Sequence, residues 1–123
     1  MRFPRLLNIA TRVVKDALQS LPADIRNEAA DCRIEFVEMD SLMDTDEDLD
    51  PDLLGLFEGN ARCDPLPESP DEMPRILLFL DNLWDECGGD LAVYRHEVRI
   101  TFLHELGHYL GLDEDEVAAL GLA

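Results

Sequence analysis

The sequence predicts an α+β fold in which a few short strands pack against helices. The first twenty residues repeat apolar side chains every three to four positions, three short segments have the composition of strands, and a helical pattern fills residues 90–110. A chain of 123 residues has room for one hydrophobic core and not for two. We therefore expect residues 1–123 to form a single domain.

The N-terminal part is predicted to hold two helices and a strand. Apolar residues recur at helical spacing over residues 5–20, just behind Pro4, which suits the first turn of a helix. Pro22 ends this pattern, and a shorter helix is expected over residues 23–30. In CRIEFVEM, residues 32–39, apolar and charged side chains alternate at first, as in a half-buried strand.

Two further strands are predicted on either side of a proline-rich connection. LLGLFEG, residues 53–59, is expected to form a short strand, and PRILLFL, residues 74–80, a buried one. The prolines between them cannot donate to a strand ladder, so the connection is predicted to be a loop. Asp81 is expected to cap a short helix that Gly88 and Gly89 end.

The charge of the chain argues against some classes of partner. Ten basic residues against 28 acidic ones give a net charge of −18, and nucleic-acid binding depends on Lys and Arg. We therefore expect neither nucleic-acid binding nor attachment to an anionic membrane, and no apolar run approaches the roughly 20 residues that cross a bilayer. The charge favours basic peptides or proteins as partners, although improved solubility explains it equally well.

One acidic run resembles the start of a calcium-binding loop. Asp44, Asp46 and Asp48 match the first three ligand positions of a helical-hairpin loop, but Leu49 stands where the loop needs Gly and Gly55 where it needs Glu. We interpret the run as a solvated acidic loop.

The three cysteines are predicted to be reduced thiols. Cys32, Cys63 and Cys87 are odd in number and contain no C-x-x-C pair, and no export signal is visible at the start of the sequence. We expect a cytoplasmic protein whose cysteines serve as small buried hydrophobic residues.

The long C-terminal helical pattern contains the chemically informative motif. HELGH places His104 and His108 four residues apart, and therefore on one face of the helix, where both rings can reach one metal ion. Glu105 is rotated by about 100° from His104, beside the metal, where it can act as a base for a bound water. Zinc peptidases divide the work among these residues in this way.

The rest of the helix can pack away from the histidines. Its opposite face carries apolar side chains at helical spacing, with Leu103 and Leu110 at the border: Leu91, Val98, Phe102, Leu106 and Tyr109. Gly107 has no side chain, which suggests that another backbone passes close to the metal.

A third ligand is expected beyond the end of the helix. Gly111 readily takes the left-handed conformation that ends a helix, so the chain can turn back toward the metal there. Glu114 is the first choice as third ligand, and Asp113 and Asp115 are the alternatives. Asp113 also forms a D-x-x-E capping arrangement with Glu116, and capping by Asp113 is compatible with ligation by Glu114.

Three other side chains near the motif receive ordinary interpretations. His96 lies eight residues, about 12 Å of helix, before His104, and is expected to be a partly exposed or hydrogen-bonded imidazole, not a ligand. Tyr94 and Tyr109 are expected to pack as aromatic residues.

The stretch EVRITFLHELGHYLGLDEDEVAALG resembles the C-terminal end of the small bacterial zincin-like metallopeptidase family. HELGHYLGLDE matches H-E-x-x-H-x-x-G-x-x-(D/E), and the order of the preceding helices and strands is similar over most of the chain. Tyr109 and Leu110 stand where histidine and phenylalanine are frequent in the family, and neither belongs to the ligand set that the resemblance implies.

The resemblance implies a zincin-like fold, with a small mixed sheet packed against helices and the active helix near the C-terminus. It implies zinc held by His104, His108 and the acidic ligand Glu114, with Glu105 as general base. The predicted activity is zinc-dependent hydrolysis of peptide bonds. One alternative is a non-catalytic zincin-like module that uses its acidic surface to hold a basic protein; another is a histidine pair that binds no metal.

Overall fold

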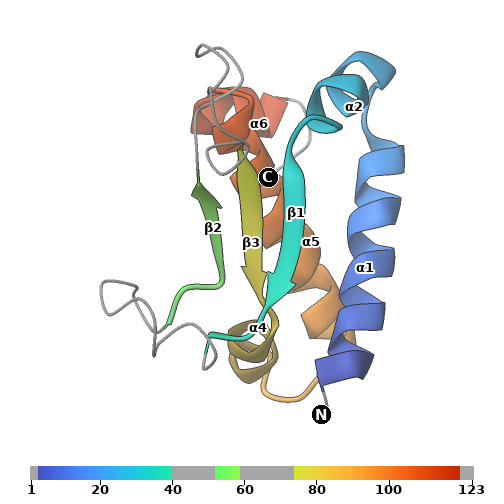
Figure 1. Ribbon diagram of the computed structural model, residues 1–123, viewed down its shortest axis with the longest axis vertical. Helices are drawn as coiled ribbons and strands as arrows, with labels where there is room; N and C mark the ends of the chain where they lie inside the picture. The colour runs from blue at the N-terminus through green and yellow to red at the C-terminus, as the bar shows by residue number, and fades with distance from the viewer. Residues whose placement is uncertain (1–2, 40–51, 59–73, 120–123) are drawn as a thin grey trace.

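The computed structural model of the protein describes residues 3–39, 52–58 and 74–119 (Figure 1). In chain order its elements are α1 (Phe3–Ser20), α2 (Ala23–Ala29), β1 (Arg33–Val37), β2 (Gly55–Glu58), β3 (Arg75–Phe79), α4 (Leu80–Glu86), α5 (Leu91–Tyr109) and α6 (Glu114–Ala119). The α+β prediction is confirmed, and the predicted bounds agree with the observed ones to within about two residues.

The three strands form one mixed sheet in the order β1-β3-β2. β1 runs parallel to β3, with Glu35 opposite Leu77, and β2 runs antiparallel to it, with Phe57 opposite Ile76. The mixed sheet implied by the resemblance is therefore present. β3 is the central strand, and β2 lies at one edge (Figure 1).

The two faces of the sheet belong to different hydrophobic clusters, because successive side chains of a strand point to opposite sides. Ile76 and Leu78 of β3 join the main core together with buried residues of α1 and α5. Leu77 and Phe79 point the other way and form a smaller cluster with Met39. The helices therefore cover one face of the sheet. In Figure 1, α5 lies behind the strands and α1 lies beside α5.

Helix α1 packs along α5 and is fixed to it by a buried hydrogen bond. Leu6, Ala10, Val14 and Ala17 of α1 are buried. The hydroxyl of Tyr94 in α5 donates to the Leu6 carbonyl at 3.0 Å. The Tyr94 ring also packs edge-on against Trp84, and its burial raises the pKa of the phenol. The interpretation of Tyr94 as a packing residue is confirmed.

One predicted helix cap is wrong. Helix α4 begins at Leu80, and its N-cap residue Phe79 makes no side-chain capping bond. Asp81 lies in the first turn, where its carboxylate accepts a hydrogen bond from the Met39 amide at 2.9 Å. Asp81 therefore ties the segment after β1 to α4, a role that depends on tertiary contact. Gly88 and Gly89 follow the helix at φ 62° and 83°, as expected for a helix terminus.

An ion-pair network joins the three strands at one end of the sheet. Arg75 of β3 lies 2.6 Å from Glu58 of β2 and 3.2 Å from Glu35 of β1. The Arg75 side chain is 41% exposed, so each pair contributes at most about 1 kcal/mol.

Cys32 and Cys87 are buried free thiols, as predicted. Burial raises the pKa of Cys32 to about 12. Cys63 and residues 44–51 of the acidic run lie outside the described residues. Among the helices that the structure describes, none is both long and apolar enough to cross a membrane.

Candidate metal centre

Helix α5 carries the HELGH motif on its exposed side. Asp90 caps its N-terminus by accepting from the amides of Ala92 and Val93 at 2.9 and 3.2 Å. Of the predicted apolar side, Val98, Phe102, Leu106 and Tyr109 are buried and Leu91 is partly exposed. His104 and His108 are exposed. Packing of α5 in the core therefore leaves both imidazoles free to face solvent.

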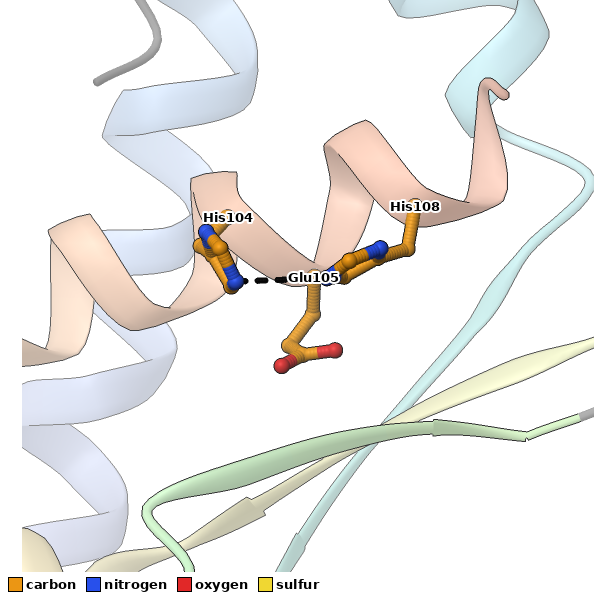
Figure 2. Close-up of side chains that lie close together, drawn as sticks. All are labelled: His104, Glu105 and His108. Carbon is orange, nitrogen blue, oxygen red and sulfur yellow. Dashed lines mark hydrogen bonds between the residues drawn. The ribbon is translucent and has the colours of Figure 1, made fainter. Parts of the chain in front are cut away.

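The two imidazoles meet at their Nε2 atoms. These atoms lie 3.2 Å apart, with the ring planes nearly perpendicular (Figure 2). In a tetrahedral site with Zn–N bonds of about 2.0–2.1 Å, two ligating nitrogens lie about 3.3 Å apart. The observed spacing of His104 and His108 fits two ligands of one zinc ion.

Glu105 completes a three-residue cluster. One ligand atom from each of His104, Glu105 and His108 lies within 4.8 Å of the others. Figure 2 shows the Glu105 carboxylate projecting from α5 on the side of the strands. Glu105 is half-buried, which suits a carboxylate that contacts a metal-ligated or substrate group from one side.

The edge strand β2 passes directly beside Glu105 at Gly55. A Cβ atom built on Gly55 would lie 2.7 Å from Thr101 Cγ2 and 3.3 Å from Glu105 Cγ. Gly55 therefore allows a close approach of the β2 backbone to Glu105 that any larger residue would obstruct. The close backbone approach expected at Gly107 stays a prediction, although Gly107 itself is buried. The approach at Gly55 was not among the expectations. A glycine inside a predicted strand was the available signal.

The end of α5 has the turn that the sequence predicted. Gly111 has φ 74°, its amide donates to the His108 carbonyl at 3.1 Å, and the Leu112 amide donates to the Gly107 carbonyl at 3.0 Å. These two bonds define a Schellman motif. The chain changes direction immediately after His108 and leads into α6.

Of the acidic residues after the turn, Asp113 caps helix α6. Asp113 accepts from the Glu116 amide at 2.8 Å, and Glu116 accepts from the Asp113 amide at 3.3 Å, so the predicted capping arrangement is confirmed. Within the described residues, neither Asp113 nor Asp115 belongs to the His104–Glu105–His108 cluster. Glu114 is the first residue of α6, and its side chain lies outside the described part of the structure. Its assignment as third ligand stays a prediction.

Tyr109 and His96 agree with their ordinary interpretations. Tyr109 is buried, and its ring lies 5.9 Å from that of Phe57 in β2, which adds a second contact between α5 and the edge strand. His96 is exposed, and among the described residues it is not part of the metal cluster.

A family model described as Zincin-like metallopeptidase matches residues 28–122, which are 95 of the 123 residues. The chain belongs to this family. The zincin-like match begins within α2 and includes the sheet, α5 and α6, whereas α1 lies before it. No curated protein matches the chain. The family resemblance and the zincin-like fold expected from the sequence are thus confirmed.

Proposed function

We propose that this zincin-like chain is a zinc-dependent peptidase, with His104, His108 and Glu114 holding zinc and Glu105 acting as general base. The observation that carries the proposal is the meeting of the two Nε2 atoms at 3.2 Å with the Glu105 carboxylate beside them. The solvent exposure of both imidazoles supports it, because a catalytic site needs an open coordination position.

When bound, zinc lowers the pKa of water and polarises the substrate carbonyl. Glu105 takes a proton from the attacking water as the water oxygen bonds to the carbonyl carbon. The C–N bond then breaks, and Glu105 returns the proton to the leaving amine, so atoms and charges balance. Strand β2 passes close to Glu105 at Gly55, which limits where the Glu105 side chain can swing and helps to keep its carboxylate beside the histidines.

The proposed substrate is an extended peptide aligned with β2. In the part of the chain that the structure describes, β2 pairs with β3 on one side and with no strand on the other. An edge of this kind can accept a peptide by main-chain hydrogen bonds. The net charge of −18 favours peptides that carry Lys or Arg.

The test combines metal analysis with a cleavage assay. The untagged protein should contain about one zinc per chain, lost on chelation and restored on addition of zinc, and should cleave members of a peptide library. Glu105→Gln should retain zinc and lose turnover by about 10²-fold or more. Glu97→Gln makes the same charge change on the same helix, outside the cluster, and should leave turnover nearly unchanged. Cleavage by Glu105→Gln at the wild-type rate would refute the assigned base.

The third ligand needs separate variants. Glu114→Ala should weaken zinc binding, whereas Asp113→Ala should mainly lower stability, because Asp113 caps α6. Zinc bound tightly with no cleavage of any peptide would favour the non-catalytic binding module instead.

A further inference from the structure

A groove between α1 and α5 lies apart from the HELGH motif. Its volume is about 330 Å³, near the lower limit for small-molecule sites. Two apolar and five polar or charged residues line it: Val13, Ala17, Asp16, Ser20, Arg95, His96 and Arg99. The groove therefore combines a small apolar wall with a concentration of nitrogen donors.

The donors of the two arginines in the groove are not occupied by any other residue that the structure describes. Among the described residues, Arg95 and Arg99 make no ion pair or hydrogen bond, although the sequence holds 28 acidic residues. Arg75, by contrast, contacts both Glu35 and Glu58. The guanidinium donors of Arg95 and Arg99 are thus available to a ligand.

The four-residue spacing of Arg95 and Arg99 in α5 brings their guanidinium groups close together. Arg95 and Arg99 are four residues apart in α5, about 6 Å along the axis, and lie on the same face of the helix. Two guanidinium charges oppose the single carboxylate of Asp16, and the His96 ring supplies a further nitrogen. Guanidinium groups present several N–H donors in a planar fork that matches the oxygens of phosphate.

We propose that this groove binds the phosphate group of a small phosphorylated compound. A phosphate offers three oxygens to the two arginines and His96, which a monocarboxylate cannot match. The groove is independent of the metal centre: Arg99 precedes His104 by five residues and about 140° of helical rotation. Its α1 wall also lies outside the segment matched by the family model.

The test is an NMR titration of the full-length His104→Ala/His108→Ala variant, so that no metal-ligated phosphate contributes. Inorganic phosphate and phenyl phosphate are the probes, and acetate is the comparison. Saturable shifts of the α1 and α5 amides that line the groove are expected, with acetate at least several-fold weaker. Tighter binding of phenyl phosphate than of inorganic phosphate would assign the apolar wall to an organic substituent; equal binding would identify the free ion as the ligand.

Charge-matched variants test whether phosphate binds in the groove itself or only responds to the overall charge of the protein. Arg95→Gln/Arg99→Gln should weaken phosphate binding by roughly tenfold or more, whereas Arg5→Gln, on α1 but outside the groove, should change it less than about twofold. Asp16→Asn should tighten binding, and Asp24→Asn on α2 should not. Absence of saturable shifts, or equal weakening by Arg5→Gln and by the double variant, would overturn the proposal.

Discussion

Adding one methyl group at Gly55 tests how closely β2 approaches α5. The new Cβ would lie 2.7 Å from Thr101 Cγ2, and non-bonded carbons prefer about 3.5–4.0 Å, so the methyl intrudes by about 1 Å. Overpacking of this kind costs about 1–3 kcal/mol. Gly→Ala also stabilises by about 0.4–1 kcal/mol through the unfolded chain. We expect Gly55→Ala to be destabilised by about 1–2 kcal/mol.

The assay is urea and thermal unfolding followed by circular dichroism. For a chain of this length the predicted loss corresponds to a fall in Tm of about 3–8 °C. A second substitution, Thr101→Ser, removes the Cγ2 methyl that the new Cβ would strike, and should recover most of the loss in the double variant. Two approaches at 3.3 Å remain, to Leu78 Cδ2 and to Glu105 Cγ. On the proposed function, the approach to Glu105 should appear as a lower kcat with little change in KM or zinc content.

Gly88→Ala is the matched control. Gly88 has φ 62°, and a Cβ there would meet nothing within 4 Å, so its cost is conformational and Thr101→Ser should not relieve it. A Gly55→Ala protein as stable as wild type would refute the close approach. Failure of Thr101→Ser to rescue it would show that the clash lies elsewhere.

Three further outcomes are expected. Tyr94→Phe should lower the free energy of unfolding by about 1–2 kcal/mol, because the buried Leu6 carbonyl loses its donor; an unchanged urea midpoint would contradict the assigned bond. Gly111→Ala should cost about 1 kcal/mol in thermal unfolding, since φ is 74° there, and Gly111→Asn should cost less. Burial raises the pKa of Cys32 from 9.0 to about 12, so the unfolded chain ionises this thiol first and stability should fall as pH rises through that window. Urea titrations at about pH 8 and pH 10.5 should show a smaller fall for Cys32→Ala.

Features encoded by neighbouring residues were predictable from the sequence. The i, i+4 spacing of His104 and His108, the turn at Gly111 and the reciprocal cap between Asp113 and Glu116 each depend on residues a few positions apart. Local geometry fixes such features wherever the helix lies in the fold.

Features that join distant segments were not predictable. Asp81 was expected to cap its own helix, but it binds the amide of Met39, which lies 42 residues earlier in the chain. The close passage of Gly55 beside Glu105 requires the strand order β1-β3-β2, which no periodicity specifies. The sequence did not indicate that His96 lines a groove, because about half of the groove's lining residues belong to α1.

The hydrogen bond between Tyr94 and Leu6 joins residues 88 positions apart, and only one of them lies in the matched segment 28–122. A fragment cut at that boundary would uncover the side of α5 that α1 shields, and we expect it to aggregate. During synthesis, likewise, α1 cannot bury its apolar side against α5 until Tyr94, 88 residues after Leu6, has left the ribosome. Truncation studies of such proteins should therefore begin upstream of α1.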